Sequence, residues 1–236
     1  MDTGEEALSK LSGGHVLDVA TGSGGFIQFL MDNLDDYKEF TGIDNNPRSL
    51  EAATQAHPQE NVHFRQMDAT QMDFPDRHFD TVCMANSLHH MADLPGALAE
   101  MKRVLKPGGN FIISEMYRDG QAETQLTHVA LHHWWAAVDT AQGIIHFETF
   151  TRQQIIEIAE KLGLQQLRLY DLKDLELDPK DPELVQQLDS IIDRYIQRLE
   201  NLDEATELRQ RGEELRQRVH GIGFHGATEL LVLGKK

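Results

Sequence analysis

The stretch Gly14–Gln28, GHVLDVATGSGGFIQ, decides the fold of this chain. Residues 15–20 are an apolar run that predicts a short buried strand, and residues 26–30 open a helix. Between them, residues 21–25 predict a tight turn, because glycines let the backbone approach a ligand without a Cβ in the way. The first helical turn presents its N–H groups to whatever lies there. A strand, a glycine turn and a helix in this order predict a ligand cradle.

Asp18 lies two residues inside the end of the predicted strand. A carboxylate below a glycine turn would repel a pyrophosphate and would attract a ligand that carries an ammonium group. A glycine-rich loop without any ligand is the plainer interpretation of glycines alone. Asp18 is the residue that argues for a ligand.

Composition limits the partners of this chain. It has 236 residues, enough for one large domain or one domain with an appendage. The 22 Lys and Arg against 39 Asp and Glu give a net charge of −17, which disfavours a nucleic-acid or anionic-membrane partner. The single cysteine, Cys83, rules out an internal disulfide and a cysteine-based zinc site. With no apolar run of membrane-spanning length and no signal-peptide pattern, we expect a cytoplasmic protein.

Short apolar segments alternate with helical segments over the first half of the chain. Strands are predicted at residues 15–20, 39–44, 61–67, 79–85 and 110–115, and helices at 26–33, 48–57 and 94–104. Asn46 and Pro47 are the expected cap and first residue of the second helix. Residues 106–109, KPGG, are the expected stop of the third helix. This alternation predicts βαβ units and a parallel sheet with helices on both faces.

Beyond Arg118 the pattern changes, and insertions are expected. Helices are predicted at residues 121–141, 151–162 and 183–199, with a break near 201–204, a weaker helix at 205–219, and strands at 164–175 and 227–234. We therefore expect an α/β fold with a Rossmann-like, doubly wound, seven-stranded sheet, mostly parallel with an antiparallel last strand, plus helical insertions. The expected parts are a core at 1–118, a helical lid or substrate insertion at 119–150, the last helix and strands of the core at 151–178 and 227–236, and a helical insertion at 179–226.

Two classes of cofactor use a cradle of this kind. A dinucleotide fingerprint requires glycines at positions one, three and six. Counted from Gly22, the sixth position is Ile27; counted from Ala20, the first position is alanine. The other class is S-adenosylmethionine (SAM). Asp44, at the end of the second predicted strand, can accept hydrogen bonds from the ribose hydroxyls of either.

The chain resembles the class I SAM-dependent methyltransferases, within them the group typified by ubiquinone and menaquinone biosynthesis methyltransferases. The segments that carry the resemblance are VLDVATGSGGF (16–26), TGIDNNPRSLEAA (41–53), FRQMDATQMDFPDRHFDTV (64–82), NSLHHM (86–91) and ALAEMKRVLKPGGNFIISE (97–115). The resemblance covers about residues 14–116 and implies an enzyme that moves the methyl group of SAM to a small-molecule acceptor by in-line displacement. The alternatives are a SAM- or nucleotide-binding protein without catalysis and an NAD-dependent oxidoreductase.

The resemblance also implies the roles of individual residues toward SAM. Asp18 reaches the methionine ammonium, directly or through water, and Asp44 holds the ribose hydroxyls. The other implied contacts are the turn Gly22, Ser23 and Gly24 on the methionine and ribose, Asn45, Asp68 and Ala69 on the adenine, and Asn86 on the methionine part. Ala20 stands where the family usually has glycine.

A catalytic base is needed only if the acceptor must lose a proton. The candidates are His89, His90, Tyr117 and His133, although pairs like His89 and His90 are frequent in this group and can equally shape the pocket or serve the structure.

The histidines of the predicted helix 121–141 have several interpretations. His128 and His132 are four residues apart, so they share a helix face and can together ligate a metal. Because no further ligand follows at a suitable spacing, we expect no metal. A lid over the substrate, with walls at His133, Trp134, Trp135 and Phe147, and ordinary packing are the other interpretations. The apolar stripe of residues 183–199 either packs within the chain or forms a homodimer interface.

Overall fold

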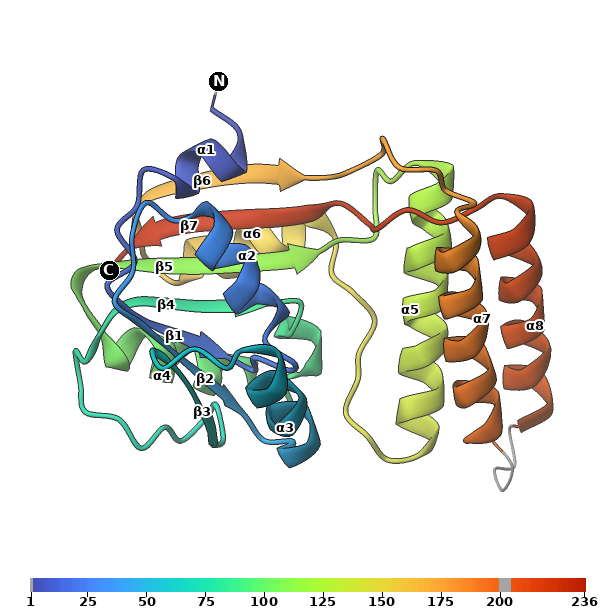
Figure 1. Ribbon diagram of the computed structural model, residues 1–236, viewed down its shortest axis with the longest axis horizontal. Helices are drawn as coiled ribbons and strands as arrows, with labels where there is room; N and C mark the ends of the chain where they lie inside the picture. Colours follow the sequence, from blue (N-terminus) through green and yellow to red (C-terminus); the bar gives the residue numbers. More distant parts are fainter. Residues whose placement is uncertain (1, 200–204) are drawn as a thin grey trace. The chain divides into compact units, whose positions relative to one another are not determined.

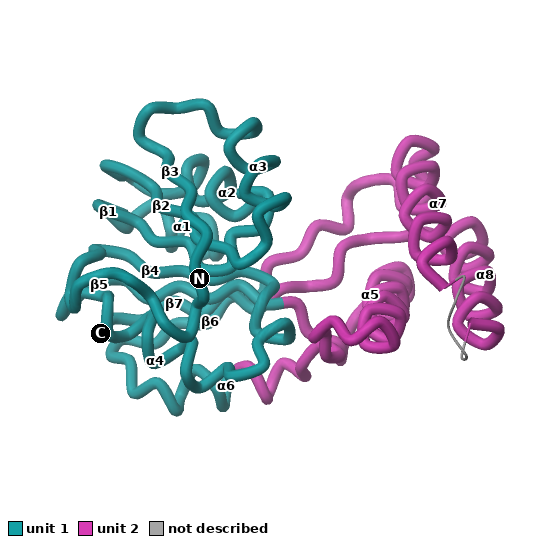
Figure 2. The backbone as a smooth tube through the Cα atoms, turned by 90° about the horizontal axis from the view of Figure 1, so that it is seen from below, with its two compact units in different colours: residues 1–115, 156–171, 230–236 teal, residues 116–155, 172–229 magenta. Residues whose placement is uncertain are grey.

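The computed structural model of the protein describes residues 2–199 and 205–236. Its backbone forms two compact units (Figure 2). Unit 1 consists of Met1–Glu115, Ile156–Asp171 and Leu230–Lys236, and unit 2 consists of Met116–Ile155 and Leu172–Glu229. None of the described helices is both long and apolar enough to cross a membrane.

Unit 1 is built on a sheet with the strand order β3-β2-β1-β4-β5-β7-β6. These strands are β1 (His15–Val19), β2 (Glu39–Asp44), β3 (Val62–Gln66), β4 (Phe79–Ala85), β5 (Leu105–Met116), β6 (Gln165–Leu172) and β7 (Glu229–Lys235). Because β1 pairs in parallel with both β2 and β4, the strand order reverses at β1. β7 runs opposite to β5 (Figure 1). The predicted Rossmann-like, doubly wound sheet with an antiparallel last strand is confirmed.

Helices cover both faces of this sheet. Figure 1 shows α1 (Gly4–Leu8), α2 (Gly25–Asn33) and α3 (Pro47–Ala56) in front of it, and α4 (Leu94–Val104) and α6 (Arg152–Lys161) behind it. The start of α3 is as predicted, since the Asn46 side chain accepts a hydrogen bond from the Arg48 N–H at 3.0 Å and Pro47 takes the first helical position.

The predicted start of the fifth strand was wrong by five residues. α4 ends at Val104 as expected, but β5 begins at Leu105, so the KPGG segment lies inside the strand. The reason is tertiary pairing: Leu105 pairs with Phe79, and an irregularity in register follows before Thr81. Local turn signals such as Pro107 could not show this pairing.

Unit 2 contains a helical bundle with a core of its own. Its long helices are α5 (Glu123–Ala141), α7 (Pro182–Gln197) and α8 (Ala205–Gly221). Their buried core residues are Leu131, Trp134, Val138, Leu188, Ile192, Leu199, Leu208, Leu215 and Val219. The apolar stripe of residues 183–199 therefore packs within the chain. The break expected near residues 201–204 lies outside the described residues.

Trp134 is not the lid wall that its sequence context suggested. Its side chain is fully buried in the core of unit 2, where its Nε1 donates a hydrogen bond to the Leu208 carbonyl at 2.8 Å. α8 passes so close that a Cβ at Gly212 would lie 2.5 Å from Cζ2 of Trp134. Glycine is therefore required at this helix crossing.

We expect Gly212→Ala to destabilise the protein. Alanine favours the helix by up to about 1 kcal/mol, but the clash with Trp134 costs about 1–3 kcal/mol. Urea and thermal unfolding, followed by circular dichroism, measure the difference. Gly221→Ala is the matched control. Gly221 belongs to the same helix, and an added Cβ there would meet no neighbouring atom within 4 Å. Equal stabilities of the two variants would contradict the packing described for Trp134.

Candidate cofactor site

The turn after β1 contains three residues in left-handed backbone conformations. Ala20 and Gly22 each have a φ of 55°, and Gly24 has a φ of 85°. A Cβ at Gly22 would meet no atom within 4 Å, whereas a Cβ at Gly24 would lie 2.6 Å from the His57 ring. The open space above Gly22 is what a ligand cradle requires. Gly24 is needed for a different reason, since the His57 ring packs against the turn and its Nε2 lies 3.0 Å from the Gly24 carbonyl.

Asp18 is buried directly before this turn. It accepts a hydrogen bond from the Thr21 hydroxyl at 2.6 Å, and the Sγ of the buried Cys83 lies 3.4 Å from its other carboxylate oxygen. Burial raises the pKa of Asp18 to about 7, because two weak donors replace only part of the lost hydration, and the charge of Asp44 adds to the effect. The groups that contact this carboxylate carry no positive charge, and the ammonium group of a ligand would supply one.

Asp44 links the end of β2 to the turn after β1. Its Oδ2 accepts a hydrogen bond from the Gly22 N–H at 2.9 Å, and its Oδ1 accepts one from the Asn46 N–H at 2.8 Å. Each carboxylate oxygen can accept a second bond, so this anchoring leaves capacity for ribose hydroxyls. The two backbone contacts hold the carboxylate at the carboxyl edge of the sheet.

The remaining residues predicted for the adenine and the turn lie on the same edge of unit 1. Asn45 and Ser23 are exposed, and Ala69 is half-buried. Asp68 follows β3, and hydrogen bonds from the Thr70 N–H and hydroxyl hold the pKa of this carboxylate below its ordinary value. Asp68 is therefore ionised and able to accept a hydrogen bond from an adenine amine. These roles stay predictions.

The loop after β4 is pinned from the end of β5. Both the Ser87 and Leu88 N–H groups donate to Oε2 of the buried Glu115, at 3.1 and 2.9 Å. The other carboxylate oxygen lies 2.6 Å from Nδ1 of His89, which is also buried. Asn86 begins this loop with a φ of 44°, a conformation that asparagine tolerates better than most residues. Glu115 thus orients the segment that was predicted to touch the methionine part of the cofactor.

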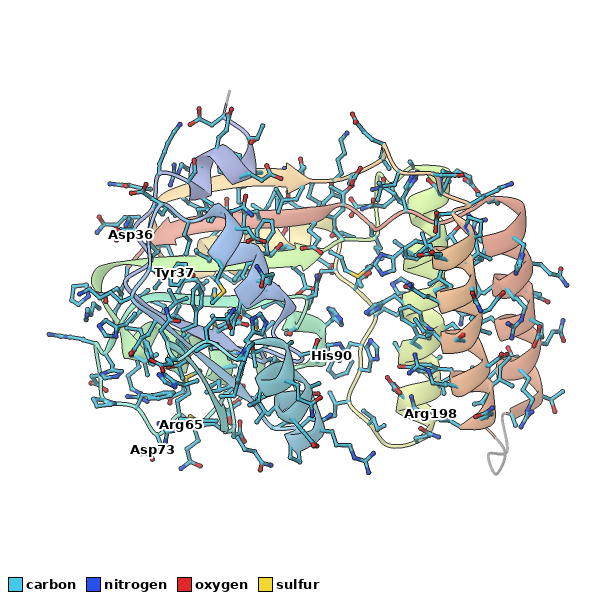
Figure 3. The ribbon with its side chains drawn as sticks, viewed as in Figure 1. Asp36, Tyr37, Arg65, Asp73, His90 and Arg198 are labelled. Atoms are coloured by element: carbon cyan, nitrogen blue, oxygen red, sulfur yellow. The ribbon has the colours of Figure 1, made fainter. Side chains whose placement is uncertain are left out.

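The catalytic candidates fall in different units. His89 belongs to unit 1, and its neighbour His90, labelled in Figure 3, is exposed. Tyr117 and His133 belong to unit 2. Tyr117 is buried, and Nε2 of His133 lies 2.9 Å from the Thr149 hydroxyl. This contact ties α5 to the segment after it. The catalytic role of each remains a prediction.

Two residues of the site had escaped the sequence reasoning. His57 follows α3, and nothing in its surroundings in the sequence indicates a contact with Gly24. Glu115 lies one residue before the end of β5, so its position was informative, but its hydrogen bonds to Ser87 and Leu88 could not be predicted from the sequence.

Comparisons with known proteins identify the domain that carries these residues. Residues 17–113 match the family model of a methyltransferase domain. Residues 17–113 thus carry a methyltransferase domain. The family match confirms the methyltransferase domain that the sequence motifs predicted. SAM is the cofactor of such domains, and one solved neighbour is in complex with it.

Two curated relatives illustrate the reach of this similarity. The demethylmenaquinone methyltransferase of Deinococcus radiodurans is 39% identical over 112 residues, which cover 47% of this chain and 46% of the relative. The 2-phytyl-1,4-naphtoquinone methyltransferase of Synechococcus elongatus is 28% identical over 174 residues, 68% of this chain and 75% of the relative. The chain thus spans less than half the length of several curated relatives, for example 42% of a Mycobacterium ulcerans methyltransferase.

Solved structures share the fold of this methyltransferase domain. The phosphoethanolamine N-methyltransferase 2 of Haemonchus contortus, in complex with SAM, has a TM-score of 0.58 at 17% identity, covering 98% of this chain and 50% of that protein. The [4+2]-cyclase SpnF has a TM-score of 0.61 at 20% identity, covering 98% of this chain and 79% of that protein. At these identities the likeness concerns the fold alone, and the same fold carries different names.

We expect Ala20→Gly to stabilise the protein without ligand. A left-handed conformation costs an L-residue about 1–2 kcal/mol, and the extra freedom of glycine in the unfolded chain offsets about 0.4–1 kcal/mol of the gain. Thermal unfolding is then expected to shift upward by about 1–4 °C. Gly22→Ala tests the same conformation in reverse, because its Cβ has open space and only the backbone cost remains. A stabilised Gly22→Ala would contradict this explanation.

We expect Asp18 to make stability depend on pH. Because burial raises the pKa of Asp18 in the folded protein to about 7, above the 3.8 of an exposed aspartate, folding binds a proton between these pH values. This contribution is fully present below pH about 4 and is lost as pH rises through about 7, with a total of about 4 kcal/mol. Asp18→Asn removes the titration, so its urea midpoint should increasingly exceed that of the wild type from pH 4 to 8. Parallel curves for the two proteins would contradict the buried, protonatable state of Asp18.

Proposed function

We propose that this chain is an enzyme that transfers the methyl group of SAM to a small-molecule acceptor. The observation that carries the proposal is the placement of Asp18 and Asp44 around the glycine turn, at the edge where the strand order reverses. A ligand that joins an ammonium group to a ribose satisfies both carboxylates at once. In a sheet of this kind, that edge is the place where ligands bind.

The residues present fit SAM on two counts. The buried carboxylate of Asp18 gains a counter-ion from an amino-acid ammonium, which lowers the cost of its ionisation. The space that a Cβ of Gly22 would fill is open, so a ligand can approach the backbone there. Asp44, already held by two backbone N–H groups, would accept the ribose hydroxyls, and Asp68 with Ala69 would hold the edge of the adenine.

The bound sulfonium supplies an activated methyl group, and the chain supplies position. Displacement in line requires the acceptor atom about 3 Å from the methyl carbon, so much of the rate comes from orientation. Glu115 contributes by fixing the loop of Ser87 and Leu88. The same carboxylate accepts the Nδ1 proton of His89, which leaves Nε2 as the nitrogen able to take a proton from an acceptor hydroxyl. His133 and Tyr117 are the other candidates for that step.

The acceptor is proposed to be a small molecule bound by the insertion at residues 119–150. Two of the curated relatives named above are named for quinones. In this segment Ile144, Ile145 and Phe147 expose large apolar side chains, which favours a partly apolar acceptor. The net charge of −17 argues against a nucleic-acid acceptor. A screen of hydroxylated and quinone-like compounds, with release of S-adenosylhomocysteine as the readout, would identify it. The same screen separates an enzyme from a protein that binds SAM without catalysis.

Binding of S-adenosylhomocysteine tests the cofactor assignment. Isothermal titration should give heat with this product and none with NADH. Asp44→Ala should weaken the binding about 10- to 100-fold, because hydrogen bonds to a charged group contribute about 1.5–3 kcal/mol.

Asp73→Ala is the matched control for this charge removal. Asp73 belongs to the same unit, is 95% exposed at its side chain and lies 3.8 Å from Arg65 (both labelled in Figure 3). Its loss should leave binding unchanged. Clear binding of NADH without any response to S-adenosylhomocysteine would overturn the function, and an unaltered affinity in Asp44→Ala would overturn the ribose contact.

A further inference from the structure

Three buried polar side chains in unit 2 contact one another in a row. Nδ1 of His146 lies 2.7 Å from Oδ2 of Asp139, and Nε2 of His146 lies 3.4 Å from Nε2 of His132. All three residues are buried. His132 lies in the middle of α5 and His146 in the segment after this helix. The polypeptide therefore folds back along α5 and brings the two rings together.

The distance between the two Nε2 atoms is long for a hydrogen bond, since N–H donors are commonly found about 2.9–3.0 Å from their acceptors. It fits a different arrangement. Two imidazole nitrogens that bind one tetrahedral zinc ion at 2.0–2.1 Å are about 3.3–3.4 Å apart. The two ring planes meet at 79° in an edge-to-face contact with their centres 4.8 Å apart, so the imidazoles do not stack.

Asp139 prepares His146 for such a role. The carboxylate accepts the Nδ1 proton of His146, so Nε2 of that ring is the nitrogen without a proton. Histidines that bind metals in proteins almost always donate their other ring N–H to a carboxylate, a carbonyl or water.

Arg198, the residue directly after α7, fixes this carboxylate. Its Nη2 lies 2.5 Å from Oδ1 of Asp139, and its Nε donates to Gln142 at 2.9 Å. The guanidinium also lies 4.5 Å from the centre of the Tyr195 ring. Figure 3 labels Arg198 in the helical bundle. A carboxylate held on both oxygens in this way sets the orientation of His146.

The neighbouring histidines of α5 are engaged elsewhere. His128 accepts a hydrogen bond from the Ala227 N–H at 2.8 Å, and burial lowers the pKa of His128 to about 4. Nε2 of His133 contacts Thr149. The ring centres of His128 and His132, the pair that the helical spacing had suggested, are 6.4 Å apart. The pair that the fold brings together is His132 with His146.

We propose that His132 and His146 bind a divalent first-row transition-metal ion, zinc being the best fit, and that Asp139 orients His146 on that ion. Imidazole suits zinc, copper, iron and nickel. Two protein nitrogens leave further positions of the ion for water or for an oxygen atom of a small molecule. The site is defined by its ligands and does not depend on methyl transfer, so its failure would leave the proposed function untouched.

Metal binding to the whole chain tests this site. Protein freed of metal by chelation is dialysed against zinc chloride, and bound zinc is measured by atomic emission; cobalt chloride, added separately, reports the ligand field by its visible spectrum. We expect one ion per chain and a tetrahedral cobalt spectrum. Both should be lost in His132→Ala/His146→Ala. Asp139→Asn should bind zinc about 10- to 100-fold more weakly.

His220→Ala is the matched control, because this exposed histidine of unit 2 contacts Asp189 and lies on another helix. It should bind zinc as the wild type does. Imidazole ¹⁵N spectra of the wild type provide a readout that needs no folded variant, with zinc shifting the resonances of His132 and His146. Zinc binding that survives the double substitution, absence of zinc binding, or unchanged imidazole resonances would each overturn the proposal.

Discussion

The burial of one carboxylate, Asp18, is the constraint on which the rest of unit 1 depends. β1 is the strand at which the order of the sheet reverses, and the side chains before and after Asp18 are buried. A charge there is costly in water-free surroundings. The chain accepts this cost beside a turn whose backbone passes through left-handed conformations, which is where a cationic ligand group could be received. Local stability is thus reduced at this position, as is common at functional sites.

Two further carboxylates organise the same edge by a shared device. Asp44 ends β2 and accepts N–H groups from the loop after β1 and from its own loop. Glu115 lies near the end of β5 and accepts two N–H groups from the loop after β4. In each case a carboxylate at a strand end holds the loop of the neighbouring strand. Charge-assisted hydrogen bonds, which are stronger than neutral ones, thus fix each of these loops to the neighbouring strand.

Much of the architecture could be predicted from the sequence, because it rests on local signals. Strands such as β2 and β4 are apolar runs bounded by turn residues, and their bounds match the expectation. The cofactor residues were predicted through a resemblance, and their contacts with SAM stay predictions. What escaped prediction depends on pairs far apart in the chain: Leu105 with Phe79, Trp134 with Gly212, His57 with Gly24, and His132 with His146. Spacing along one helix favoured His128 as the partner of His132, and only the return of the chain after α5 shows the other pair.

The strand order has a consequence for folding during synthesis on the ribosome. β7 lies between β5 and β6, yet it is translated after β6 and after both α7 and α8. A nascent chain therefore holds β6 without its neighbour until β7 has been translated. Exposed strand edges invite pairing with other chains. β6, with the sequence QQLRLYDL, has no fully buried position and is interrupted by charged and polar side chains. Such a composition suits a strand whose edge is exposed to water until β7 has been translated and pairs with it.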